Sequence, residues 1–175
     1  LSGETAVGNF PIAAVTVMRG VADASFDHLH RRNLDGTRDD PASPAQGMIE
    51  AIGLVLRAVP ITKVIAITRS GYAARMLSAH SVSQPILAIS DDEAMARSFN
   101  ILSGVEGYYI NVPFPRGSAD HIKGCIKHLY ELGQLDRDDL LLITGVVYPR
   151  SGTRMNMMQI HKLSDLVQEF SWAQN

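Results

Sequence analysis

The sequence contains only one cysteine, Cys125, among 175 residues. A single cysteine excludes an internal disulfide and a cysteine-based zinc site, which fits a reducing compartment, so we expect a cytoplasmic protein. An excess of positive charge is also lacking, since 16 Lys and Arg stand against 18 Asp and Glu. There is thus no broad basic face for nucleic acid or anionic lipid. Because no apolar run approaches the roughly 18 residues of a membrane span, we expect no nucleic-acid or membrane partner.

The residues that are present are typical of a folded globular protein. Apolar residues make up 46% of the chain and charged residues 19%, which is enough for a core and too little charge for a disordered chain. A length of 175 residues fits one domain with an appended segment, and it is too short for a barrel joined to a regulatory domain. Because the first residue is Leu1 and not Met, we expect the chain to begin inside a longer protein.

Two helices separated by a polar connection are predicted in the first third of the chain. Apolar residues recur at helical spacing from Pro11, a favoured first-turn residue, to about His28. The next stretch is polar and is interrupted by glycine and proline, which is typical of a linker. Ser43 then provides an N-cap for a second, amphipathic helix. The predicted divisions are an N-terminal segment at 1–30, a linker at 31–42 and a main domain at 43–175.

From residue 63 onward, short apolar runs alternate with helical segments, which is the pattern of strands buried in a parallel sheet. The fold class is therefore α/β. Strands are predicted at 64–68, 86–89, 105–112 and 140–144, with a further strand of undetermined direction at 155–160. Helices are predicted at 71–80, 91–102 and 119–132 and in the tail at 162–175. Their starts are signalled by a capping box of Ser90 and Glu93, and by Ser118 and Ser164 as caps.

The most informative local feature is the loop of Thr68, Arg69, Ser70 and Gly71, which joins a buried strand to a helix. Backbone N–H groups at the helix start, two hydroxyls and a guanidinium can converge there on one phosphate. The alternative is that the hydroxyls cap the helix and the glycine permits the turn. The loop lacks the glycines of a dinucleotide-binding fingerprint and the Gly-Lys-Ser/Thr of a nucleoside-triphosphate loop, so neither ligand is indicated.

A second polar loop follows the strand at 140–144 and should lie at the same carboxyl edge of the sheet. Its candidate ligand-binding residues are Arg150, Ser151, Gly152 and Thr153. They are suited to close over a phosphorylated ligand held by the first loop. The alternative is a solvated turn with ordinary surface arginines.

Other chemistry-bearing residues are interpreted as structural. The six histidines form no HExxH motif and no cluster with carboxylates at metal-ligand spacing. The acidic run at 91–93 is typical of a first helical turn, where carboxylates interact with the helix dipole. Cys125 falls among apolar mid-helix positions, as an inert buried thiol does. His121 is expected at the surface, the alternative being a protonated group that faces an anion. We expect no metal site and no nucleophile–base pair in this chain.

The opening residues resemble a known family. The string LSGETA at residues 1–6, with the glycine and proline that follow, is similar to the pyruvate kinase segment that closes the last strand-helix unit of the catalytic barrel. The Thr-x-Ser-Gly motif at Thr68 and the later Ser151, Gly152 and Thr153 with Asn156 resemble that family's C-terminal domain. The resemblance implies a three-layer sandwich, in which helices cover both faces of a mainly parallel five-stranded sheet with one antiparallel edge strand.

The resemblance also implies a parent enzyme. Pyruvate kinases transfer a phosphoryl group from phosphoenolpyruvate to ADP in glycolysis, with magnesium and usually potassium. The family's catalytic lysine, acidic metal ligands and substrate-binding arginine belong to barrel segments that precede Leu1. Ser2 matches a serine at the barrel mouth that cannot catalyse the reaction alone. We therefore expect no cofactor and no kinase activity in this chain by itself, and we expect its own catalytic barrel and a homotetramer as partners in the full-length enzyme.

In this family, the C-terminal domain binds a sugar phosphate or a nucleotide monophosphate as an allosteric effector. By resemblance, the phosphate contacts map to Thr68, Arg69, Ser70 and Gly71, with the loop at 145–154 as a lid. Two departures are Ala73, where members that respond to fructose bisphosphate often have a hydroxyl, and His121, where they have an arginine. A bisphosphate is therefore not implied. A monophosphate effector and a ligand-free module that only associates subunits both stay open.

Overall fold

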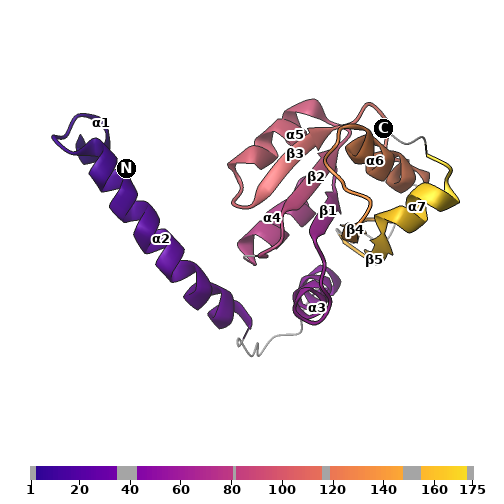
Figure 1. Ribbon diagram of the computed structural model, residues 1–175, viewed down its shortest axis with the longest axis horizontal. Coiled ribbons are helices and arrows are strands. Elements are labelled where there is room, and N and C mark those ends of the chain that lie inside the picture. Colours follow the sequence, from indigo (N-terminus) through magenta and orange to yellow (C-terminus); the bar gives the residue numbers. More distant parts are fainter. Residues whose placement is uncertain (1–2, 35–42, 81, 116–118, 148–154, 173–175) are drawn as a thin grey trace. The chain divides into compact units, whose positions relative to one another are not determined.

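The computed structural model describes residues 3–34, 43–80, 82–115, 119–147 and 155–172 (Figure 1). The chain divides into two compact units, residues 1–37 and residues 38–175. The first unit contains the short helix α1 (Gly3–Ala6) and the long helix α2 (Pro11–Leu34). Pro11 is the first residue of α2, as predicted, and the helix continues beyond His28, where its apolar pattern fades. The backbone thus stays helical through part of the stretch that was predicted to be linker.

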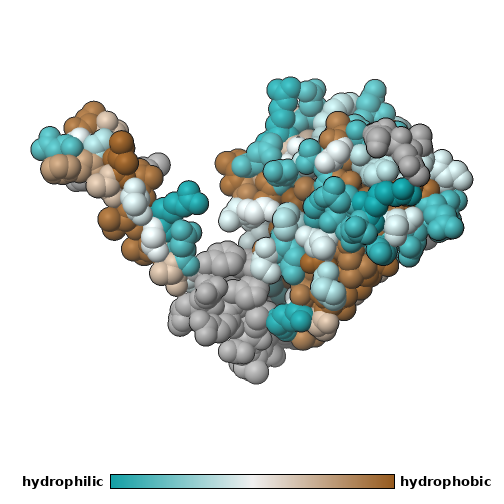
Figure 2. Space-filling view, viewed as in Figure 1, coloured by the Kyte–Doolittle hydropathy of each residue, from teal (hydrophilic) through white to brown (hydrophobic). Residues whose placement is uncertain are grey.

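The first unit exposes large apolar side chains over much of its length. Figure 2 shows apolar residues gathered along α1 and α2 on the face in view. The most exposed are Val7 (86%), Ile12 (82%), Phe10 (76%), Val17 (66%) and Val21 (62%). Exposed apolar side chains in this number are more than a solvated helix needs.

The second unit is built on a sheet whose five strands, within the described residues, lie in the order β3-β2-β1-β4-β5. β1 pairs in parallel with β2 and β4, β2 pairs in parallel with β3, and β4 pairs antiparallel with β5. The mainly parallel sheet with one antiparallel edge strand is confirmed. The strands are β1 (Lys63–Ile67), β2 (Ile86–Ser90), β3 (Val105–Tyr109), β4 (Leu140–Gly145) and β5 (Met157–Lys162).

Helices cover both faces of this sheet, as expected for a three-layer sandwich (Figure 1). One layer contains α3 (Pro44–Ala58), α4 (Tyr72–Ala79), α5 (Glu93–Ser98) and the 3₁₀ turn η1 (Phe99–Ile101), and the other contains α6 (Asp120–Glu131) and α7 (Leu163–Glu169). Successive residues of a central strand enter opposite layers. In β1, Val64 and Ala66 pack against the layer of α3 and α4, while Ile65 and Ile67 pack against the layer of α6 and α7. Burial on both faces explains why this strand is a continuous apolar run in the sequence.

The predicted helix starts are partly correct. The Ser43 hydroxyl caps α3 by accepting the backbone N–H of Gln46 at 3.2 Å. The capping box of Ser90 and Glu93 is wrong, because Ser90 is the buried last residue of β2 and the N-cap of α5 is Asp92, whose carboxylate accepts from Met95 N. Ser164 is not a cap either. Because α7 begins at Leu163, directly after β5, this serine lies inside the helix. Ser118 lies outside the described residues.

One strand boundary differs from the sequence prediction for a reason visible in the fold. β3 ends at Tyr109, before the predicted end at 112, and the chain then turns toward Pro113 and Pro115, which cannot donate a ladder hydrogen bond.

The tail after β5 packs into the α6 layer through Leu163, Leu166, Val167 and Trp172. The tail is therefore part of the folded domain.

Candidate functional site

The Thr68 loop, residues 68–71, lies at the carboxyl edge of the sheet between β1 and α4. The backbone N–H of Thr68 donates to the Ile89 carbonyl at 2.9 Å, which holds the loop start against β2. Gly71 then adopts a left-handed conformation with φ 71° and is the N-cap residue of α4. A Cβ at this position would lie 2.7 Å from the Phe99 ring and 2.9 Å from Arg75 Nη1, so the turn requires glycine. The strand, polar turn and helix occur in the order that the sequence predicts.

Arg69 is not a free cation of this loop, because its guanidinium forms an ion pair with Asp91. Nε lies 3.0 and 3.2 Å from the two carboxylate oxygens, Nη2 also donates to the carboxylate, and Nη2 lies 3.3 Å from the Phe114 carbonyl. The backbone N–H of Phe114 donates to the same carboxylate at 3.1 Å. The bond from Arg69 holds the pKa of Asp91 below its usual value, although burial opposes this shift.

The interpretation of the acidic run as residues of a helical first turn is therefore wrong for Asp91. This residue precedes α5 and joins the chain segments that follow β1, β2 and β3. The contact also raises the pKa of the Arg69 guanidinium. Arg69 and Asp91 are 22 positions apart, and only the pairing of β1 with β2 brings them together.

Arg75 is a second cation at the loop, and the sequence interpretation missed it. Its Nη2 donates to the carbonyl oxygen of Ser70, so the side chain folds back over the start of its own helix. Helical side chains lean toward the helix N-terminus, and Arg75 stands four residues after Gly71. The four-residue spacing from Gly71 was the signal in the sequence that could have placed Arg75 at the loop. The loop is thus flanked by two guanidinium groups, one of them paired with a carboxylate.

His121 is buried, in contrast to the expectation of a surface residue. Only 6% of it is exposed, and its ring lies 4.9 Å from the ring of Phe114. The connection between β3 and α6 places Phe114 over the first turn of α6, which covers the imidazole. Phe114 therefore contacts the Arg69–Asp91 pair through its backbone and α6 through its ring.

The base of the second predicted loop lies beside the first, because β4 pairs with β1. Asn156 holds this base from both sides: its Oδ1 accepts from Val147 N at 2.8 Å and its Nδ2 donates to Val147 O at 2.7 Å. The two ends of the loop are thus held together, one just after β4 and the other just before β5. The candidate residues Arg150, Ser151, Gly152 and Thr153 lie outside the described residues, as does Ser2.

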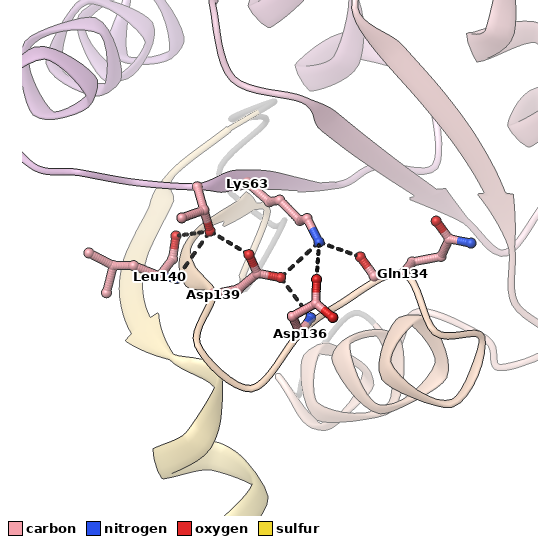
Figure 3. A network of polar contacts seen from close by, with 6 residues as sticks. Lys63, Gln134, Asp136, Asp139 and Leu140 are labelled. Carbon is pink, nitrogen blue, oxygen red and sulfur yellow. Dashed lines mark hydrogen bonds and ion pairs between the residues drawn. The ribbon is translucent and has the colours of Figure 1, made fainter. Parts of the chain in front are cut away.

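A polar network at the opposite, amino edge of the sheet surrounds Lys63 (Figure 3). Its Nζ lies 2.8 Å from Asp139 Oδ2, 2.8 Å from the Gln134 carbonyl and 3.6 Å from Asp136 Oδ2. Thr62 donates to the other Asp139 oxygen at 2.7 Å. Burial raises the pKa of Asp139, but the hydrogen bonds from Lys63, Asp136 N and Thr62 outweigh it and lower the pKa. The network joins the starts of β1 and β4, and we interpret it as structural.

In the part of the chain that the structure describes, no group of three or more His, Cys, Asp or Glu side chains is arranged to hold a metal ion. Among the helices of these described segments, none is both long enough and apolar enough to cross a membrane. The candidate site therefore consists of the Thr68 loop with Arg75, Asp91 and Phe114.

Comparison with known proteins gives consistent matches over most of the chain. Residues 48–161 match the family model described as pyruvate kinase, alpha/beta domain. The chain is 31% identical over 171 residues to the pyruvate kinase of Staphylococcus aureus and 28% identical over 172 residues to that of Bacillus licheniformis. These alignments cover 94% and 95% of this chain but only 28% of each relative. A crystal structure of a pyruvate kinase from Cryptosporidium parvum superposes with a TM-score of 0.66 at 27% identity, covering 93% of this chain and 32% of that one.

Proposed function

Because the chain belongs to the pyruvate kinase family and carries that family's C-terminal alpha/beta domain, we propose that it is the allosteric and subunit-associating part of a pyruvate kinase. In this proposal the Thr68 loop binds a phosphorylated effector, a sugar phosphate or a nucleotide monophosphate. The full-length enzyme transfers a phosphoryl group from phosphoenolpyruvate to ADP with magnesium and potassium in the cytoplasm. The chain spans 28% of the length of the curated relatives it matches.

The observation that carries the effector proposal is the geometry of the Thr68 loop. The loop stands at the carboxyl edge of a parallel sheet, where α/β domains bind ligands. Its glycine, at φ 71°, starts a helix whose first-turn N–H groups face the loop, so the positive end of the helix dipole lies there. The exposed Ser70 adds a hydroxyl, and Arg75 places a guanidinium beside Gly71. These groups are the donors that a phosphate monoester requires.

Subunit association is proposed at the outer edge of β5. This strand is the last in the sheet order, so its backbone groups on one side can pair with another strand. Ile160 on β5 is 40% exposed, which provides apolar area for such a contact. We assign this edge to a contact between copies of the chain in a homo-oligomer, a tetramer in the full-length enzyme.

The first unit is proposed to pack against the rest of the enzyme's own catalytic barrel. Its exposed apolar residues support this role, because Phe10 is 76% and Ile12 is 82% exposed. In this proposal the chain does not catalyse phosphoryl transfer by itself, since it spans only 28% of the length of the pyruvate kinases it matches.

A thermal-shift series on the full chain tests the effector proposal. Ribose 5-phosphate, AMP, glucose 6-phosphate and fructose 1,6-bisphosphate are added separately. At a concentration a hundred times its Kd, an effector stabilises the folded state by about 2.7 kcal/mol and so raises the Tm by several degrees. Ser70→Asp should abolish the rise, because a carboxylate repels the phosphate, whereas Ser83→Asp, at an exposed serine elsewhere, should retain it.

The second candidate is a ligand-free module that only associates subunits. The ion pair between Arg69 and Asp91 favours it, because one of the two loop cations already has an anionic partner. A flat thermal response to every ligand, with oligomerisation intact, would replace the effector proposal with this one.

A further inference from the structure

The carboxylate of Asp91 is a built-in anion at the candidate phosphate site. It accepts from Arg69 Nε and Nη2 and from the backbone N–H of Phe114, so two chain segments hold it in place. Its side chain is 10% exposed, whereas that of Arg69 is 53% exposed. Asp91 is therefore a fixed group that presents its charge to the loop, unlike a solvated surface carboxylate.

Carboxylates and phosphates bind a guanidinium in the same way, through two parallel hydrogen bonds from adjacent nitrogens. The contacts from Arg69 to Asp91 use Nε and Nη2, which form one such pair. Nη2 also contacts the Phe114 carbonyl. A phosphate that approaches this side of Arg69 must therefore displace a carboxylate that is already seated there.

We propose that Asp91 acts as an internal competitor that sets the affinity of the Thr68 loop for phosphorylated ligands. This inference rests on the proposed effector function and specifies which residue tunes it. With Asp91 in place, a phosphate binds mainly through Arg75, Ser70 and the start of α4. When Asp91 loses its charge, Arg69 becomes available as a second guanidinium, and the repulsion between carboxylate and phosphate disappears.

The ligand class follows from the local charges. Among the described residues of the site, Arg69 and Arg75 contribute two positive charges, and Asp91 cancels one of them. The single excess charge of these described residues suits one phosphate group better than two. The site in its native form is therefore suited to a small monophosphate, and a bisphosphate gains more than a monophosphate from the removal of Asp91.

The test measures binding of inorganic phosphate and of ribose 5-phosphate to the full chain by isothermal titration calorimetry at constant ionic strength. Asp91→Asn keeps the shape and an oxygen that accepts the Phe114 N–H, but it removes the charge. It should tighten binding about tenfold, as expected for a unit charge removed within several ångströms of the ligand. Glu93→Gln is the matched control. It makes the same charge change on the neighbouring helix, where Glu93 pairs with Arg97, and should alter the affinity less than about twofold.

A double-mutant cycle separates a direct action through Arg69 from a general charge effect. In an Arg69→Gln background, Asp91→Asn should change the affinity much less than it does in the wild type, because no guanidinium is released. Asp91→Ser is measured beside the asparagine variant, and circular dichroism verifies that each variant is folded. A purely structural role for Asp91 would produce weaker binding, not tighter binding.

The outcomes distinguish this inference from the proposal beneath it. If the wild type binds ribose 5-phosphate and neither Asp91 variant binds it more tightly, the competitor role is wrong and the effector site stands. If the gain is equally large with and without Arg69, Asp91 does not act through Arg69, which also overturns the inference. If neither the wild type nor any Asp91 variant binds either probe, both proposals fail.

Discussion

Replacing Asp139 with asparagine should destabilise the α/β unit substantially, because this carboxylate is the centre of the Lys63 network. It is 9% exposed and accepts hydrogen bonds from Lys63 Nζ at 2.8 Å, Thr62 Oγ1 at 2.7 Å and Asp136 N at 2.7 Å. Removing one partner of a buried ion pair typically costs about 3–5 kcal/mol. Lys63 is 21% exposed and retains the Gln134 carbonyl, so we expect a smaller loss, about 2–3 kcal/mol.

The assay is thermal and urea unfolding at pH 7, with Asp138→Asn as the matched control. Asp138 is in the same turn, its side chain is fully exposed, and its contact with Lys162 is 3.9 Å long. Asp139→Asn should lower the Tm by roughly 8–12 °C for a unit of this size, and Asp138→Asn should leave it unchanged. Equal Tm values for the two variants would refute the reasoning, because the Lys63 network would then stabilise the unit no more than an exposed ion pair does.

The same prediction has a defined pH dependence. The pKa of Asp139 is lower in the folded chain than in the unfolded chain, so its contribution is fully present above the ordinary aspartate pKa of about 3.9. The contribution is lost as the pH falls through the folded-state pKa, where Lys63 and Asp136 are the neighbouring charged groups. The stability difference between wild type and Asp139→Asn should therefore be constant from about pH 5 to 7 and shrink below about pH 4. If the stability difference between wild type and Asp139→Asn grew as the pH fell, the lowered pKa of Asp139 in the folded chain would be contradicted.

Two further predictions concern packing and reactivity. Gly107→Ala should destabilise the unit by about 3 kcal/mol, since a Cβ there would lie 1.9 Å from the Ala96 carbonyl oxygen, whereas Gly47→Ala, in an open part of α3, should stabilise it by about 0.5–1 kcal/mol. Urea unfolding of both variants measures the two changes in stability. Changes of the same sign would disprove the view that contact with Ala96 makes glycine necessary at position 107. Cys125 should not react with a thiol reagent at pH 8 until denaturant is added, because burial raises its pKa to about 12. Rapid labelling of the folded chain would show that the α6 layer opens.

The local elements were predictable because their signals are short in sequence. The apolar runs around Val64, Leu87 and Leu142 indicate strands buried on both faces, and the structure contains them there. Ser43 before Pro44 indicates a helix start, and Ser43 caps α3. In each case the residues that determine the element are neighbours in the chain, so pattern alone was sufficient.

Helix starts that depend on burial were less predictable. Ser90 carries the right side chain for a cap, but it is buried at the end of β2, and Asp92 takes that role. His121 has a polar side chain near a helix start, yet Phe114 covers it. Propensity describes a residue in isolation, and it fails where a packed neighbour changes the environment.

By itself, the sequence determined the α/β class, the alternation of strands and helices, and the Thr-x-Ser-Gly loop that carries the family resemblance. Only the tertiary structure decided how the charges around that loop are paired. The strand order sets Asp91 against Arg69, 22 positions away, and Asp139 against Lys63, 76 positions away. Such pairs depend on which strands are adjacent, and adjacency is settled by the packing of the whole sheet. No local pattern in the chain records it.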